Sequence, residues 1–489
     1  MKTWESAIKN MGALSLMGLI GKGLQFLLFA VLTRVFALKE VGIFTTVVTL
    51  IWFMSSLTDL GVSHVLVREI ARDTSQTGSL VSRGLVITGC AAIVAWVALI
   101  GISLAGGYAD MPDLLIIVSG LAILGNTLAQ TGFSAFRGFQ RMEIQAILVS
   151  GFQLASALIG LALALTGFNI MAQVINIVTV SIMGALLTLV IVHRYFGSLR
   201  VTVDINPCKR LLASSLPVGM LFSYFVLMQW IGLIILGLVR PMAEVAVYGA
   251  AGKIFDGTAI IIGSSVLTLL PLMAKAVSES RGKARLLYER SIRLSLAFGL
   301  GVAVMFTFLA DQVVVTVFGA AYSAAATPLR ILGWSLFFAT ASGPMVVFLA
   351  SDDEQLKKAM RPLGCLVLGS ILLNLMLGSY LGYIGSSLAF LVISCSLFVL
   401  SLCVFRSSFG FGLPLVSMLL KPGQAGLVMG MCLWLLHAQH LAVSVPVGAI
   451  AFFTILGLSG ECKEEPYRSL LSGRRLRFLR TLLIRDNWW

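Results

Sequence analysis

Long apolar runs recur along almost the whole chain, and they restrict the folds that it can adopt. Runs of about 20 residues follow one another from Met11 to about Gly457, and a helix needs about 20 apolar residues to cross the hydrocarbon core of a bilayer. The runs are continuous rather than alternating, which favours helices over the strands of an outer-membrane barrel. Charged residues make up only 11% of the chain, against about 25% in soluble domains. We therefore expect an all-α polytopic membrane protein.

The ends of the runs predict about fourteen transmembrane helices. No small-residue cleavage site follows the first run, so we expect it to be a true span rather than a signal peptide. The predicted spans cover residues 11–33, 42–62, 84–105, 114–134, 144–166, 170–192, 214–236, 247–272, 294–310, 328–350, 363–382, 384–405, 424–440 and 441–459.

The distribution of lysine and arginine predicts the orientation of the chain. If the N-terminus is cytoplasmic, 29 of the 35 lysines and arginines fall on the cytoplasmic side, four fall outside and two lie within spans. This asymmetry follows the positive-inside rule, so we expect both termini in the cytoplasm. The formal net charge of +14 then reflects topology and contact with anionic membrane lipids, and it does not indicate nucleic-acid binding.

The loops offer little chemistry. The predicted outer loops are short, such as "GGYADMPD" and "HAQH", and the inner loops contain no phosphate-binding glycine-rich loop and no kinase motif. His437 and His440 are one helical turn apart, but a short hydrophilic hairpin is favoured over a metal site. The seven cysteines show no metal-binding spacing. We expect no enzyme activity, no metal and no cofactor, and a function that is carried out within the bilayer.

Two pairs of similar segments indicate an internal repeat. "EVGIFTT" at Glu40–Thr46 is similar to "EVAVYGA" at Glu244–Ala250, and "LAILGNTL" at Leu121–Leu128 is similar to "LRILGWSL" at Leu329–Leu336, at offsets of 204 and 208 residues. Each offset covers six spans, which predicts two six-helix bundles related by a pseudo-twofold axis along the membrane normal, with a cleft between them and alternating access. The expected domains are an N-terminal six-helix bundle (1–200), a C-terminal six-helix bundle (201–410), two additional helices (411–460) and a basic amphipathic cytoplasmic tail that anchors to the inner leaflet (461–489).

Two lysines lie inside predicted spans. Lys22 is about 16 Å from the start of the first span, where an unpaired cation costs at least about 2.5–3.5 kcal/mol. It should therefore face protein or a wet cavity, with Gln25 on the same face. Lys253 lies in the eighth span with Asp256 at i+3. These two residues either line a wet cleft that handles an anion or a proton, or form an ion pair that packs helices, and we favour the cleft.

Other polar residues leave more than one interpretation open. Arg34 and Arg240 follow the first and seventh spans, and they form either a basic outer rim for an anionic ligand or solvated helix ends. Asp59 ends the second span, where it lies at the interface, pairs with Arg68 or has a function of its own. Asn126, Gln130 and Tyr248 either border the cleft or serve as interhelical hydrogen-bonding and interface residues. A cleft with one lysine from each half would favour a substrate that carries phosphate or carboxylate.

Several motifs resemble one family of transporters. The segment Gly21–Asp73 contains "TRVFALKEVGIF", the "DLG" that ends the second span and the charged loop "REIARD"; "FSAFRGFQRMEIQA" follows the fourth span and "VAVYGAAGKIFD" opens the eighth. Together they resemble the polysaccharide repeat-unit (O-antigen or oligosaccharide) flippases of the multidrug/oligosaccharidyl-lipid/polysaccharide (MOP) exporter superfamily. The resemblance extends over nearly the whole chain.

The resemblance implies a function and roles for particular residues. Such proteins move undecaprenyl-diphosphate-linked oligosaccharides from the inner to the outer leaflet of the bacterial cytoplasmic (inner) membrane, in pathways such as lipopolysaccharide synthesis, alongside a polysaccharide polymerase and a chain-length regulator. By this likeness Lys22, Lys253 and Arg34 would attract the diphosphate or acidic sugars. Asp256 and Asp59 would couple transport to protons or sodium.

Four other functions compete with this one. A multidrug or cation efflux antiporter of the same superfamily would need an acidic cavity, and few acids lie in the spans of the first half. A lipid II flippase would be expected to carry several arginines in that half, where this chain has Lys22. A glycosyltransferase or polymerase would need catalytic carboxylates and a large outer loop, and a purely structural scaffold would leave the lysines within the spans unexplained.

Overall fold

The protein was analysed as a computed structural model, which describes residues 20–108, 110–196, 205–267, 273, 278–351, 353–410, 412–436 and 439–459. These residues form helices joined by turns and bends, with no strand among them. Nine helices in this part of the chain are long and apolar enough to cross a membrane. The prediction of an all-α polytopic membrane protein is confirmed, whereas the number of fourteen spans stays a prediction.

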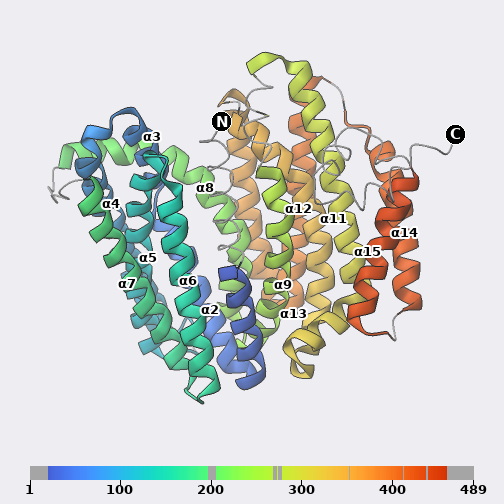
Figure 1. The fold of residues 1–489 in the computed structure, drawn as a ribbon, viewed down its shortest axis with the longest axis horizontal. Helices are drawn as coiled ribbons and strands as arrows, with labels where there is room; N and C mark the ends of the chain where they lie inside the picture. Colours follow the sequence, from blue (N-terminus) through green and yellow to red (C-terminus); the bar gives the residue numbers. More distant parts are fainter. Residues whose placement is uncertain are drawn as a thin grey trace, which may run out of the picture. The chain divides into compact units, whose positions relative to one another are not determined.

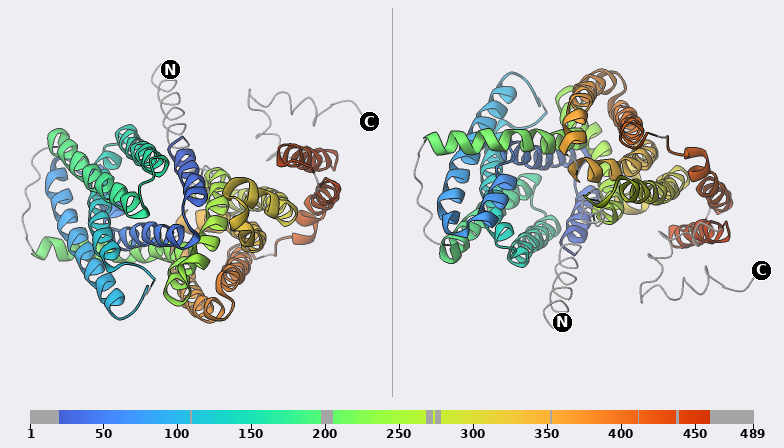
Figure 2. Two further views of the ribbon diagram at one scale, coloured as in Figure 1. Left: turned by 90° about the horizontal axis from the view of Figure 1, so that it is seen from below. Right: turned by 90° about the horizontal axis from the view of Figure 1, so that it is seen from above.

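The chain divides into two compact units, Met1–Ala246 and Val247–Trp489, coloured blue to green and yellow-green to red in Figure 1. The division falls after α8 because that helix packs against α2, α3 and α4 of the first unit (Figure 2). The predicted boundary at residue 200 separates the two sequence repeats, whereas the boundary after Ala246 separates two packed units. The repeat boundary stays a prediction. The tail at 461–489 lies outside the described residues.

The first unit is built around two buried helices. α2 and α5 are its most buried spans, and α5 packs against α2, α3, α4, α6 and α7. Small residues allow close approach, as is usual between helices in membranes: a Cβ on Gly125 of α5 would lie 2.9 Å from the carbonyl oxygen of Ser181 in α7. The unit consists of a helix at 20–35, α2 (Leu38–Thr58), α3 (Val62–Arg72), η1 (Thr74–Gln76), α4 (Thr77–Leu104), α5 (Asp113–Gly138), α6 (Met142–Leu165), α7 (Ile170–Phe196) and α8 (Ile205–Val239).

The segment containing "REIARD" is a helix, α3, and the prediction of a loop there was wrong. Val62, Val65, Leu66 and Ile70 recur at helical spacing and are all buried in one core cluster with residues of α4, α5 and α8. The charged residues of α3 occupy its other side, which makes it an amphipathic helix rather than a span.

The second unit is arranged around α11. This helix packs against α12, η2, α14 and α15, and α12 packs in turn against α13. The predicted additional helices at 411–460 correspond to α14 and α15, whose apolar contacts with α11 include Ala297 and Leu309. The helices are α9 (Met242–Leu267), which begins in the first unit, α11 (Arg281–Phe318), η2 (Ala320–Ala325), α12 (Ala326–Ser351), α13 (Asp353–Phe409), α14 (Leu415–Leu435) and α15 (Leu441–Leu458).

α13 contains two helical segments separated at Gly382. The backbone of Gly382 has φ 60° and ψ −136°, a conformation that favours glycine. Three residues later the chain passes so close to the preceding helix that a Cβ on Gly385 would lie 1.9 Å from the carbonyl oxygen of Leu377. The position of this break agrees with the predicted boundary between the spans 363–382 and 384–405.

Candidate functional site: the polar side of α9 and the charges around it

α9 carries the charged pair that the sequence places within a span. Lys253 and Asp256 are one turn apart and both are half-buried. Their charges interact electrostatically, and the buried side chain of Tyr248, two turns before Asp256, also experiences the charge of Asp256. Three of the residues singled out from the sequence are thus close together on one helix.

One side of α9 is packed and another is open. Ile254 and Phe255 are buried, and the ring of Phe255 lies edge-on to that of Phe390 in α13, with 5.4 Å between the ring centroids. In contrast, a Cβ added to Gly252 or Gly257 would meet no atom within 4 Å. These two glycines flank the charged pair at i−4 from Asp256 and i+4 from Lys253, so open space lies beside the charges.

The helix at 20–35 places its predicted site residues differently. Gly21 faces α6, where a Cβ would lie 3.0 Å from Oε1 of Gln153, and Leu28, Phe29 and Leu32 are buried. Lys22 is exposed and Gln25 is half-buried. No hydrogen bond or ion pair reaches Lys22 from the described residues. Arg34, at the end of this helix, is exposed.

Arg240 has a carboxylate partner four residues later in the chain, Glu244. Its Nε lies 3.7 Å from Oε2 of Glu244 in the first turn of α9, and both side chains are about one-third exposed or less. A basic rim formed by Arg34 and Arg240 therefore has a partly neutralised member, which weakens the attraction that Arg240 can exert on an anion.

Asp59 lies in a polar cluster at the corner between α2 and α3. Its Oδ1 accepts hydrogen bonds from the backbone N–H of Ser63 (3.3 Å) and from the Ser63 hydroxyl. Its charge interacts with His64 and with Arg137 of α5. The carbonyl oxygen of Gln130 accepts from the Ser63 hydroxyl at 3.4 Å and from Arg137 Nη2 at 3.5 Å.

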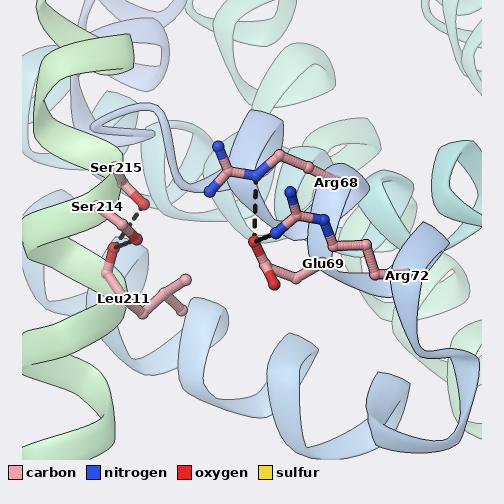
Figure 3. A network of polar contacts seen from close by, with 6 residues as sticks. All are labelled: Arg68, Glu69, Arg72, Leu211, Ser214 and Ser215. Carbon is pink, nitrogen blue, oxygen red and sulfur yellow. Dashed lines mark hydrogen bonds and ion pairs between the residues drawn. The ribbon is translucent and has the colours of Figure 1, made fainter.

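The sequence left a pairing of Asp59 with Arg68 open as one alternative, and the structure shows Arg68 paired with its neighbour Glu69 on α3. Arg68 Nε lies 3.1 Å from Glu69 Oε1, and Arg72 Nη1 lies 3.4 Å from the same oxygen. Figure 3 shows both guanidinium groups at the Glu69 carboxylate, beside the part of α8 where the hydroxyls of Ser214 and Ser215 donate to the carbonyl of Leu211. All three charged side chains are partly exposed, so their ion pairs are hydrated and weak.

Threonines that alternate with the predicted polar residues of α5 link this helix to its neighbours. Asn126 and Gln130 are half-buried on α5, and the neighbouring Thr127 and Thr131 exchange hydrogen bonds with Thr58 of α2 (2.8 Å) and Thr88 of α4 (2.9 Å). Such contacts hold polar groups inside a membrane bundle. Asn126 itself is brought to none of the charged groups described above.

Sequence reasoning missed two groups of residues because their partners are distant in the chain. Arg137 was assigned only to an inner loop, yet it lies beside Asp59, 78 positions earlier in the sequence. Lys39 and Asp110 form an ion pair of 2.8 Å across a separation of 71 residues. The signal that the sequence offered was the presence of an aromatic and an acidic residue, Tyr108 and Asp110, in the short loop "GGYADMPD".

The chemistry of these groups favours charge binding and proton exchange. Lys253 can attract an anion, and Asp256 and Asp59 can exchange a proton or bind a small cation. Among the described residues, no cluster of three or more His, Cys, Asp or Glu side chains is suited to hold a metal ion.

Comparisons with known proteins agree on the type of protein. A family described as "Polysaccharide biosynthesis protein" matches residues 7–277, and no curated protein sequence matches significantly. A solved structure of the lipid II flippase MurJ in an inward closed conformation has a TM-score of 0.75 at 13% identity, covering 94% of this chain and 99% of that one.

Two further solved structures are of MOP superfamily transporters. An inward-facing multidrug resistance MATE family transporter has a TM-score of 0.57 at 16% identity, covering 79% of this chain and 95% of that one. A MOP superfamily transporter from Pyrococcus furiosus Vc1 (DSM3638), described as having a binding pocket of reversed polarity, has a TM-score of 0.54 at 16% identity, covering 82% of this chain and 96% of that one. At these identities the likeness establishes a shared fold.

Proposed function

This chain belongs to the polysaccharide biosynthesis protein family, and from that premise we propose that it is a flippase for lipid-linked oligosaccharides. The substrate is an undecaprenyl-diphosphate-linked polysaccharide repeat unit, such as an O-antigen unit, which moves from the inner to the outer leaflet of the bacterial cytoplasmic membrane by alternating access. Family and fold are those of transporters, which supports a transport role without catalysis.

The observation that carries this proposal is the charged, open side of α9. Lys253 and Asp256 occupy an otherwise apolar span, where charges are costly and usually serve a function. Open space beside them would allow a polar headgroup to approach. A diphosphate carries the charge that a lysine attracts, while the polyprenyl chain can stay in lipid.

The other predicted site residues have roles in the same scheme. Lys22, Arg34 and Arg240 add positive charge for the diphosphate or for acidic sugars, with Arg240 contributing less because of Glu244. We also assign to the lining of the proposed transport cleft four polar residues: Gln25, Asn126, Gln130 and Tyr248. Asp256 and Asp59 couple transport to a proton or a sodium ion. A polysaccharide polymerase and a chain-length regulator act on the translocated product.

A lipid II flippase is the second candidate. The structure with that name covers nearly the whole of this chain at the highest TM-score reported above, and its substrate class also joins a diphosphate to a glycan. The two functions differ in the glycan, so the intermediate that accumulates when the protein is absent distinguishes them.

The test is a deletion of the protein in its host followed by complementation. We expect undecaprenyl-linked repeat units to accumulate on the inner leaflet, and the wild type but neither Lys22→Ala nor Lys253→Ala to restore export. Lys209→Ala is the matched control, because Lys209 is an exposed lysine at the start of α8. Accumulation of lipid II would favour the second candidate, and increased drug sensitivity without any glycan intermediate would favour efflux. If both alanine variants restored export fully, Lys22 and Lys253 would not be needed for substrate binding.

A double substitution separates binding from packing at α9. Removing one member of an ion pair leaves the other charge without compensation, whereas removing both relieves that cost. If Lys253 binds substrate, Lys253→Ala combined with Asp256→Ala should recover the membrane abundance of the wild type but not its export. Recovery of both would assign the pair to helix packing.

A further inference from the structure

The outer loop between α4 and α5 is inserted into the helices of the first unit. Tyr108 is buried, at 3% exposed, and has φ 60°. Its hydroxyl donates to the carbonyl of Ile234 in α8 at 3.5 Å. A Cβ on Gly237 would lie only 3.1 Å from the tyrosine ring and 3.4 Å from Thr46 of α2. The ring thus packs the loop against the last turns of α8, at the point where α8 also lies close to α2.

Two residues later, one carboxylate joins the beginnings of two distant helices. Asp110 Oδ1 lies 2.8 Å from Lys39 Nζ, in the first turn of α2. Asp110 Oδ2 accepts from the backbone N–H of Met242, the first residue of α9, at 3.2 Å. The hydrogen bonds from Lys39 and Met242 lower the pKa of Asp110 from its ordinary value, so the carboxylate is charged at neutral pH.

At the start of α9, Asp110 accepts from a backbone N–H that the preceding residue has no polar side chain to satisfy. The first N–H groups of a helix have no partner within it, and an acidic side chain nearby is favourable. The residue before α9 is Pro241, which has no polar side chain. Asp110 performs the capping role from a loop more than one hundred residues earlier in the chain.

The backbone of α2 holds the same turn from another side. A Cβ on Gly42 would lie 1.8 Å from the carbonyl oxygen of Met242, and the hydroxyl of Thr46 lies 3.3 Å from Met242 Sδ. These contacts belong to the first unit, which ends at Ala246. From Val247 onward the same helix belongs to the second unit, where it carries Lys253 and Asp256.

We propose that Asp110 is a positioning residue, which clasps the first turn of α9 to the outer end of the first unit and so sets the position of the Lys253–Asp256 pair during transport. The clasp is suited to open and close: Lys39 and Asp110 are 57% and 37% exposed, and exposed ion pairs are weak. The link to transport rests on the proposed function, whereas the clasp itself does not.

The clasp is tested by hydrogen–deuterium exchange of the full chain in lipid nanodiscs, followed in peptides that cover residues 242–250. Asp110→Ala removes both contacts and should increase exchange there by roughly tenfold, mainly through loss of the hydrogen bond from the Met242 N–H to a charged acceptor, because the exposed ion pair adds little. Asp110→Asn keeps an oxygen for Met242 and should have a smaller effect. Exchanging the charges, with Lys39→Asp and Asp110→Lys together, restores an ion pair but no acceptor, so it should resemble Asp110→Ala.

Asp113→Ala is the matched control in the same loop region. Its Oδ1 accepts from the Ser103 hydroxyl at 2.6 Å, a contact between α4 and α5 that does not involve α9. If Asp110→Ala leaves exchange at 242–250 unchanged, or Asp113→Ala raises it equally, the clasp is overturned.

Glycan export by the same variants tests the positioning role. We expect export at equal membrane abundance to fall with Asp110→Ala and to recover partly with Asp110→Asn. Normal export by Asp110→Ala, despite faster exchange, would overturn that role. If the wild type itself exports no glycan but the exchange pattern holds, the proposed function fails and the clasp stands.

Discussion

His64 lies at the α2–α3 corner between a negative and a positive charge. Desolvation lowers the pKa of His64, the charge of Asp59 raises it and the charge of Arg137 lowers it, and the result is below the ordinary value of 6.5. His64 is on α3, outside the spans, so water and protons can reach this part of the protein. The surroundings of His64 therefore favour the neutral form of its imidazole ring.

This shift predicts how stability depends on pH. When the pKa of the folded state is below that of the unfolded state, the unfolded chain binds the proton first as the pH falls. The free energy of unfolding should therefore decrease as the pH drops below about 6.5, until His64 is protonated in the folded state as well. Thermal unfolding in detergent at pH 7.5 and pH 5.5 measures the effect.

His64→Asn supplies the comparison for this prediction. The variant cannot titrate, so the difference in melting temperature between the two pH values should be smaller than in the wild type. An equal difference in both proteins would show that other groups control the pH dependence.

The residue-scale contacts differ in how visible they are in the sequence. Lys253 and Asp256 could be paired in advance because i and i+3 share a helix face. Asp59 with Arg137 and Lys39 with Asp110 could not, because helical periodicity contains no information on which distant helices meet. For the same reason the sequence could not choose between the alternatives for Asp59, and it did not indicate that Arg68 pairs with the adjacent Glu69.

At the scale of elements, the α2–α3 corner and α8 meet backbone to backbone. Leu60 and Gly61 both have positive φ, 50° and 77°. A Cβ on Gly61 would lie 2.4 Å from the backbone nitrogen of Gly219 in α8. Since backbone atoms cannot rotate away as side chains do, this contact fixes the distance between α8 and the corner.

We predict that Gly61→Ala destabilises the protein by about 1–3 kcal/mol, because the added methyl group overpacks a rigid contact and the backbone conformation is strained. Gly101→Ala is the control, since a Cβ there meets nothing within 4 Å, and its effect should stay within about 1 kcal/mol. Melting temperatures of the purified variants in detergent test this expectation. Equal melting temperatures for the two would contradict it.

Elements were predictable where their apolar pattern is long and continuous. The ends of α6 and α15 lie within two residues of the predicted spans. α3 was missed because its apolar residues alternate with charges over only eleven residues, a pattern easily taken for a loop. α8 begins at Ile205, about nine residues before the predicted span 214–236, because its polar first turns precede the apolar run from which the span was predicted.

At the scale of the whole molecule, both compact units have basic residues at the helix ends assigned to the cytoplasm. In the first unit these include Arg68 and Arg72 of α3, and in the second they include Lys283 and Arg285 at the start of α11. Arg68 and Arg72 contact Glu69, Lys283 contacts Glu279 and Arg285 contacts Glu289, and each of these acidic partners is close in sequence. The positive-inside rule predicts that the basic helix ends of each unit face the cytoplasm.

This rule predicts the side of the membrane on which two exposed positions lie. Arg72 follows the α2–α3 corner, and Gln439 lies between α14 and α15. In a chain whose seven cysteines are replaced, Arg72→Cys should react with a membrane-impermeant maleimide only after the cells are permeabilised. Gln439→Cys should react in intact cells, because the short outer hairpin carries no basic residue to retain it inside. The reverse labelling pattern would show that the chain has the opposite orientation in the membrane. Lys253 on α9 would then lie nearer the inner leaflet than the sequence predicts, and the proposed path of the substrate would have to be revised.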